Sequence, residues 1–140
     1  MDLATDAVTA LRTGAMQALA ARIDVAGAGA TLAIYGTTRP APGGTAGAAP
    51  LVTVSLDYPC GTAAAGVLTL ADTDFAQILN GGDPLWARLF DATPAWVGDF
   101  SVGTSAMHTA DPLTAEVILE ATHLYTGAFL ALIGAQIVGN

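Results

Sequence analysis

The sequence predicts a mainly β fold: an antiparallel β-sandwich of the jelly-roll or immunoglobulin-like kind, with one α-helix at its N-terminus. A strong hairpin pattern over residues 85–102 supports this prediction. About seven strand-like segments follow a single helical segment, at spacings of roughly 10 to 20 residues. No second helical pattern separates these segments, which argues against parallel crossover units. We therefore expect a single domain over residues 1–140, with a helix at about 5–23 and the sandwich at about 30–138.

The hairpin prediction comes from residues that alternate with the two-residue period of a strand. One face of the first arm carries Trp86, Arg88 and Phe90, and one face of the second arm carries Trp96, Gly98, Phe100 and Val102. The sequence Asp-Ala-Thr-Pro at 91–94 is typical of a turn, since Asp bonds backbone amides ahead of it and Pro cannot donate to a ladder. Both tryptophans lie in this hairpin, so we expect it to supply much of the core's large apolar area.

The helix prediction rests on apolar residues at three- and four-residue spacing within residues 4–24. They are Val8, Leu11, Ala15, Met16, Leu19 and Ile23. Thr5 is the expected N-cap, and Asp6 suits the positive end of the helix dipole. Two interpretations of the apolar stripe stay open: it packs on the protein's own sheet, or it packs on a neighbouring subunit.

The remaining segments are short strands separated by loops. The expected strands are residues 31–38, 51–56, 66–70, 115–120 and 128–138. Residues 39–50 contain three prolines and three glycines, so we expect an exposed, mobile loop. Residues 74–79 fit either one helical turn or an irregular excursion.

Composition excludes several classes of function. The net charge is −8, with four arginines, no lysine and twelve acidic residues. Binding to nucleic acid or to an anionic membrane surface needs clustered cations, so we expect neither. The N-terminus lacks the basic and apolar regions of a signal peptide, and the apolar run at 128–138 is too short to span a bilayer as a helix.

The side chains that most often carry chemistry show no recognisable arrangement. Cys60 has no cysteine partner and no evident base, so we interpret it as an inert thiol. Asp72 and Asp74, with Asp83 nearby, lack the further ligands of a calcium loop. His108 and His123 are 15 residues apart without metal-ligand spacing, and we expect His108 at the surface in a polar loop and His123 at a strand edge.

The remaining candidates for catalysis fail on spacing. Glu116 and Glu120 would lie about 13 Å apart on one strand face, which is too wide for a glycosidase pair. The glycine pairs at 43–44 and 81–82 lack the lysine and helix of a phosphate loop. No serine occurs in a nucleophile elbow; the serines considered are Ser55, Ser101 and Ser105. We therefore assign no catalytic, cofactor-binding or metal-binding residue and expect a protein that is not an enzyme.

The order of these elements resembles a group of small β-sandwich structural proteins of tailed bacteriophages. The resemblance covers residues 4–138, and it is most specific in Tyr35–Pro42 (within TLAIYGTTRPAP) and in Trp86–Ser105 (WARLFDA, a turn, then GDFSVGTS). The sequence departs from the pattern at residues 121–127, which are less regular. The resemblance implies a virion protein, made in the host cytoplasm, that assembles in many copies with other virion proteins.

Within that context, we expect a capsid decoration (cement) protein that forms a homo-oligomer. Acidity without lysine suits an outward position better than contact with packaged DNA. Two alternatives remain: a neck or tail component, including one associated with the tail tip or a fibre, and a lectin-like receptor-binding module. The exposed loop at 39–50 and Tyr58 are the features that favour the lectin-like alternative.

Overall fold

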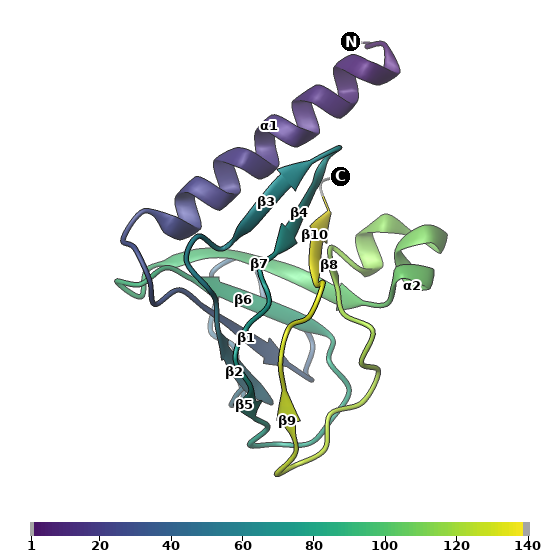
Figure 1. The fold of residues 1–140 in the computed structure, drawn as a ribbon. Coiled ribbons are helices and arrows are strands. Elements are labelled where there is room, and N and C mark those ends of the chain that lie inside the picture. Colours follow the sequence, from purple (N-terminus) through teal and green to yellow (C-terminus); the bar gives the residue numbers. More distant parts are fainter. Residues whose placement is uncertain (1, 139–140) are drawn as a thin grey trace.

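The computed structural model describes residues 2–138, which form a mainly β fold with a long N-terminal helix (Figure 1). The elements, in order, are α1 (Thr5–Asp24), β1 (Thr31–Tyr35), β2 (Val52–Ser55), β3 (Gly61–Ala64), β4 (Val67–Leu70), β5 (Ala76–Gln77), β6 (Trp86–Phe90), β7 (Trp96–Gly103), α2 (Ser105–Ala110), the 3-10 turn η1 (Pro112–Thr114), β8 (Val117–Ile118), β9 (Phe129–Leu130) and β10 (Gln136–Val138). The prediction of a mainly β fold with an N-terminal helix is therefore confirmed.

The strands form one curled sheet, a half-barrel, and the predicted two-layer antiparallel sandwich is not confirmed. The eight-stranded sheet has the order β2-β1-β6-β7-β8-β10-β4-β3, and β5 and β9 make a separate two-stranded ribbon. All pairs are antiparallel except β7 with β8. The cause is the length of β7: it pairs with β6 over most of its eight residues, and its last two residues pair with β8. One continuous strand thus joins what would otherwise be two layers.

The expectation that no further helix interrupts the strands is wrong. Helix α2 and η1 lie between β7 and β8 and provide the crossover that a parallel pair requires. Thr104 caps α2 by accepting a hydrogen bond from the Met107 amide at 3.2 Å. His108, which we expected in a polar loop, lies in this helix.

Helix α1 packs on its own sheet through its C-terminal half. Among its described residues Ile23 alone is fully buried, with Met16 and Leu19 half-buried against the same core. Val8 is half-buried, but Leu11 is 61% exposed and Ala15 also faces solvent, so the predicted single stripe is wrong at these two positions. The predicted cap is wrong as well: Ala4 is the N-cap and makes no side-chain bond.

The hairpin predicted over residues 85–102 is confirmed as β6 and β7, with a bulge between Leu89 and Phe90. The two tryptophans have different roles, however. Trp86 is buried, whereas Trp96 is 44% exposed and faces outward. The expectation that both belong to the core is therefore wrong for Trp96.

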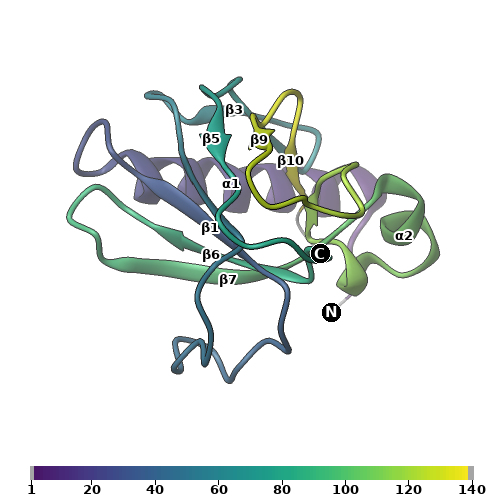
Figure 2. The same cartoon turned by 90° about the horizontal axis from the view of Figure 1, so that it is seen from below.

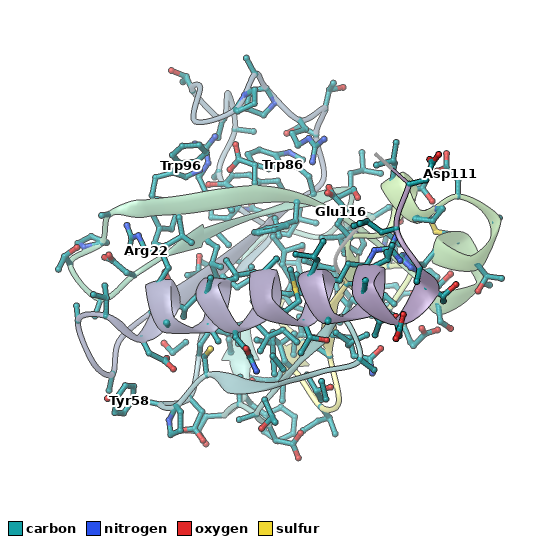
Figure 3. The ribbon with its side chains drawn as sticks, turned by 90° about the horizontal axis from the view of Figure 1, so that it is seen from above. Arg22, Tyr58, Trp86, Trp96, Asp111 and Glu116 are labelled. Carbon is teal, nitrogen blue, oxygen red and sulfur yellow. The ribbon has the colours of Figure 1, made fainter. Side chains whose placement is uncertain are left out.

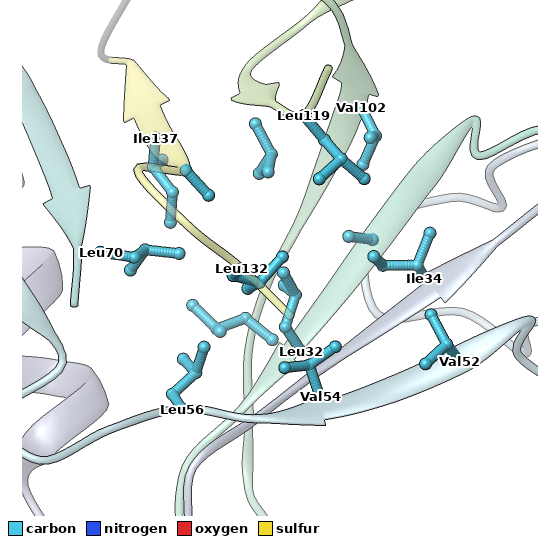
Figure 4. Packing of buried hydrophobic residues seen from close by; sticks show 14 of the residues in the cluster. Leu32, Ile34, Val52, Val54, Leu56, Leu70, Val102, Leu119, Leu132 and Ile137 are labelled. Atoms are coloured by element: carbon cyan, nitrogen blue, oxygen red, sulfur yellow. The ribbon is translucent and has the colours of Figure 1, made fainter. Parts of the chain in front are cut away.

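The main core fills the inside of the curled sheet (Figure 4). Its buried aliphatic side chains include Leu32, Ile34, Val52, Val54, Leu56, Leu70, Val102, Leu119, Leu132 and Ile137. A second, smaller cluster covers the other face of β1 and β6. There Tyr35 stacks on Trp86, with ring centroids 4.3 Å apart and planes 11° apart. Strand β1 is therefore covered on both faces, which explains why four of its five residues are buried.

The C-terminal strands are shorter than predicted. The segment at 115–120 pairs only over β8, and the run at 128–138 is divided into β9 and β10. Gly134, with φ +64°, makes the break in a conformation that favours glycine. Residues 74–79, expected as a helical turn or an irregular excursion, contain the two-residue strand β5, and β3 lies outside the strands expected from the sequence.

The C-terminal end of α1 is fastened to the hairpin turn by a salt bridge. Arg22 Nη1 lies 2.5 Å from Asp91 Oδ2, and the Asp91 side chain is buried. The same carboxylate accepts a bond from the Thr93 hydroxyl and bonds from the amides of Thr93 and Ala95, at 2.8 and 2.9 Å. The Thr93 hydroxyl, followed by Arg22 and the amides, lowers the pKa of Asp91 well below its usual range. Asp91 is therefore ionised in the folded protein at neutral pH.

We expect Asp91 to make stability depend on acid pH. Its pKa is lower in the folded state than the value of about 3.9 in the unfolded chain, so its contribution is complete above that value and is lost as pH falls toward the folded-state pKa. Urea titrations between pH 7 and pH 2 should show that Asp91→Asn is less stable at pH 7 and loses less stability on acidification. Asp57→Asn, at an exposed position, is the control. Parallel pH profiles for Asp91→Asn and the wild type would contradict this role.

Candidate functional site

A pocket of about 310 Å³ lies between the loop at 39–50 and strand β7. Figure 2 shows this loop standing out from the sheet beyond β6 and β7. The apolar and aromatic wall consists of Pro40, Pro42, Trp96, Gly98 and Phe100. The bulge shifts the alternation of β7, so the predicted common face of Trp96, Gly98 and Phe100 is wrong: Phe100 packs against the main core, whereas Trp96 lies on the outer face with Asp99. Arg39, Asp99 and Glu116 complete the lining.

The buried carboxylate of Asp99 fastens the loop to the sheet. Its Oδ1 lies 2.7 Å from Arg88 Nε and 3.0 Å from Trp96 Nε1. Its Oδ2 accepts bonds from Arg88 Nη2 and from the Gly43 amide, both at 3.1 Å. Arg88 Nη2 also donates to the Gly44 carbonyl at 2.7 Å. The loop is exposed over most of its length, as predicted, but this pair of side chains anchors it at its centre.

The anchor requires glycine at position 43. Gly43 has φ +70°, a conformation that other residues rarely adopt. A Cβ at this position would lie 3.4 Å from the Trp96 ring, an ordinary van der Waals contact, so the backbone conformation and not space is what favours glycine. The loop backbone therefore rests directly on Trp96 and covers part of its ring.

The Arg88–Asp99 pair is held in its charged form. Burial raises the pKa of Asp99, but bonds from Arg88, the Gly43 amide and Trp96 outweigh this effect, and the net shift is downward. The hydrogen bond to Asp99 raises the pKa of Arg88. Arg88 also lies over the Trp86 ring, 5.2 Å from its centroid, in cation–π geometry. An ionised carboxylate with these partners is suited to holding structure and poorly suited to transferring protons.

Glu116 forms the opposite, charged edge of the pocket. Its Oε1 accepts bonds from Arg39 Nη1 at 3.1 Å, the Ser101 amide at 3.0 Å and the Ser101 hydroxyl at 3.2 Å. Glu120 bonds elsewhere, to the Ser105 amide at 2.8 Å. The pocket therefore combines an aromatic and proline-rich wall with an ion pair at its edge, which is a surface for binding.

The two histidines make separate contacts. His108 Nδ1 lies 2.8 Å from the Ala115 carbonyl. His123 Nδ1 lies 2.5 Å from Asp83 Oδ1, and its ring meets Tyr125 edge-on. Both His123 and Asp83 are exposed, so this contact with a carboxylate is at the surface and not in a deep pocket.

The aspartates considered as metal ligands have other positions. Asp72 Oδ1 accepts a bond from the Gly134 amide at 3.2 Å, and Asp83 contacts His123. Over residues 2–138, no group of three or more histidine, cysteine or acidic side chains is arranged to hold a metal ion. Within the same range, no helix has the length and apolar character needed to cross a membrane.

Cys60 is buried at the contact between α1 and the start of β3. Its Sγ lies 3.9 Å from the Ala20 carbonyl, and its amide donates to Asp24 Oδ1 at 3.1 Å. Burial, followed by the negative charge of Asp24, raises the pKa of the thiol to about 12. A thiol that stays protonated and buried is a poor nucleophile and a poor metal ligand at neutral pH.

Comparisons of the chain with protein-family models, curated proteins and solved structures found no match. The site is therefore described by its own geometry. Sequence analysis did not identify Arg88, Asp99 and Gly43 as a unit. A signal was present for two of them: Arg88 and Asp99 face each other across the hairpin as a pair of opposite charges. Nothing in the sequence linked this pair to Gly43.

We expect Asp99→Asn to release the loop. The change leaves the Arg88 guanidinium buried without its counter-ion, which should cost on the order of 3 kcal/mol of unfolding free energy. It also weakens the acceptor for the Gly43 amide, so hydrogen exchange at Gly43 should accelerate relative to the core amides. Asp57→Asn serves again as the exposed control. Unchanged exchange at Gly43 in a folded Asp99→Asn variant would show that the pair does not anchor the loop.

We expect Cys60 to resist thiol reagents until the protein unfolds. Native protein at pH 8 should react with a colorimetric disulfide reagent far more slowly than the same protein in concentrated urea, because the thiol is buried and its pKa is about 12. Rapid labelling of native protein would mean that α1 separates readily from β3.

Proposed function

We propose that this protein is a non-enzymatic structural component of a bacteriophage virion, positioned on the capsid surface as a decoration protein. The observation that carries the proposal is the free N-terminal end of α1, the turns before Arg12 and Thr13, which contact Gly66 between β3 and β4. Figure 1 shows the N-terminal end of the helix extending past β3 and β4, the strands on which it packs. An isolated helical segment of this length gains little stability from propensity alone, so a packing partner would complete it.

The exposed surface at this end of the helix is suited to packing against another subunit. Leu11 of α1 and Leu3, which precedes the helix, are exposed large apolar side chains. Gly14, in the next turn, has no neighbouring atom within 4 Å of a Cβ position, so a second surface can approach the backbone closely there. The sequence left open whether α1 packs on its own sheet or on a neighbouring subunit. These features favour a neighbouring subunit at the N-terminal end, beside the packing of the C-terminal half on its own sheet, and they support a homo-oligomer.

The distribution of charge supports an outward position. In the described part of the chain, Arg22, Arg39 and Arg88 each pair with a carboxylate of the same molecule. With a net charge of −8, little cationic surface remains for packaged DNA. A strongly acidic surface also keeps many copies soluble before assembly.

The phage context of the proposal comes from the sequence resemblance. Its two most specific segments, Tyr35–Pro42 and Trp86–Ser105, are far apart in the sequence but form one unit in the fold. Tyr35 stacks on Trp86, and Pro40 and Pro42 face Trp96 across the pocket. The two segments that carry the resemblance therefore include both the aromatic stack and residues of the pocket beside Trp96. A position at the neck or tail fits the same observations if copies are few.

A lectin-like receptor-binding module is the second candidate, and the pocket favours it. Trp96 presents an aromatic surface beside the Arg39–Glu116 ion pair, a combination found in sites for small polar ligands. Tyr58, the other residue that suggested sugar binding, lies on the opposite side of the molecule (Figure 3). A reproducible ligand on a glycan array, lost in Trp96→Ala, would favour this candidate over decoration.

The proposal is tested by locating the protein in purified particles. Antibody labelling and electron microscopy should show many copies in icosahedral register on the capsid. A few copies at the neck or tail would overturn the decoration assignment and leave the structural role. Recovery from cell lysate only, and never from particles, would overturn the virion assignment. Leu11→Asp should fold normally and incorporate poorly, because Leu11 is exposed at the N-terminal end of α1.

A further inference from the structure

The ribbon formed by β5 and β9 is apolar on both faces. Its register pairs Gln77 with Phe129, and backbone bonds extend the pairing to Ile78 and Ala128 at 2.8 Å. One face packs inward: Ile78 is buried, and Leu130 is packed against the main core. The ribbon lies at the end of the molecule remote from the N-terminus of α1 (Figure 1).

The other face of the ribbon presents three large apolar side chains to solvent. Phe75, Leu79 and Phe129 are 76%, 65% and 63% exposed. Phe75 directly precedes β5, and strand alternation places it on the same side as Gln77. Because Gln77 is opposite Phe129, Phe75 is a diagonal neighbour of Phe129, roughly 7–8 Å away between backbone positions. Leu79 lies in the bend that follows Ile78. We call these three side chains the apolar ribbon face.

The segments that carry this face contain no charged residue: residues 75–79 read FAQIL and residues 126–131 read TGAFLA. From the exposed fractions and the usual area of such side chains, the face presents on the order of 300–400 Å². A patch of this size on a small protein is typical of an interaction site. A stable interface with any partner buries about 800 Å² on each side, so this face would form the apolar centre of a larger contact that includes its polar border.

Acidic side chains border the face. Asp57, Asp72 and Asp74 line a shallow depression together with Thr73, next to Phe75 in the chain. A second copy would bring the same acidic border into opposition. A second copy also offers no cluster of positive charge to oppose these aspartates. Among the described residues, three arginines are paired with carboxylates of the same molecule, and Arg12 of α1 lies against Gly66. Charge therefore disfavours self-association through this face and favours a partner with cations around an apolar centre.

We propose that the apolar ribbon face docks into an apolar hollow, flanked by lysine or arginine, on a different protein of the particle. This inference rests on the proposed function and specifies the partner surface. Phe75 and Phe129 are the anchors that enter the hollow, as aromatic residues commonly do at the centre of interfaces. The aspartates face the surrounding cations, so binding weakens as salt is raised.

The experiment uses particles assembled without this protein, to which purified variants are added back. Co-sedimentation measures the copies bound per particle as a function of protein concentration. The Phe75→Ser/Phe129→Ser double variant should bind about tenfold or more weakly than wild type, the loss expected when hot-spot residues are removed. Leu113→Ser is the matched control, because it removes an exposed leucine from η1, outside the ribbon. Thermal unfolding confirms that all variants fold.

Salt and oligomeric state provide the other outcomes. Asp72→Asn/Asp74→Asn should bind more weakly and with a shallower dependence on salt. If the double serine variant binds particles as tightly as wild type does, this inference is overturned and the proposed function stands. If free wild-type protein is a dimer in solution and the double serine variant is a monomer, a second copy is the partner, and the choice of a different protein is overturned. Failure of wild type to bind or enter any particle would overturn the proposed function, and this inference with it.

Discussion

The pairing of β6 with β7 is the constraint on which the rest of the structure depends. These strands are adjacent at the centre of the eight-stranded sheet, and β7 continues past the end of β6 to pair with β8. The bulge at Leu89 and Phe90 lies in this pair, and bulges increase local twist. A long strand with this twist carries the sheet around the core, so that β10, β4 and β3 face β1 and β2 across buried aliphatic side chains. The half-barrel follows from this geometry.

The same hairpin organises the outer face of the sheet. Alternate residues of β1 and β6 point away from the main core, and Tyr35 and Trp86 would be exposed there without further cover. The loop at 39–50 supplies that cover, and Ala46 packs on the cluster. Arg88 and Asp99, facing each other across the hairpin, hold the loop backbone at Gly43 and Gly44. A buried ion pair of this kind favours one arrangement of the loop over others more than it adds net stability.

These arrangements leave three surfaces incompletely covered: the N-terminal end of α1, the pocket beside Trp96 and the apolar ribbon face. They lie on different parts of the molecule, and none brings a nucleophile, a base and an orienting group together among the described residues. The buried polar groups serve the fold, since Asp91 holds α1, Asp99 holds the loop and Glu116 holds Ser101. What distinguishes the protein chemically is therefore its surface, which is the basis for proposing a structural role.

The sequence by itself determined the elements whose signals are local. The helix over Thr5–Asp24 and the hairpin of β6 and β7 follow from periodicity and turn chemistry, which depend only on nearby residues.

The tertiary structure alone decided how the sheet closes. The parallel pairing of β7 with β8 joins residues on either side of α2, and the polar, alanine-rich sequence of that helix did not reveal it. The tertiary structure also decided which side of α1 is buried and which tryptophan is exposed. Burial depends on what packs against a residue, and for Leu11 and Trp96 the apolar character of the side chain carried no information about its neighbours. The pocket could not be predicted for the same reason: it needs Gly43 and Asp99, 56 residues apart, to meet through a backbone hydrogen bond.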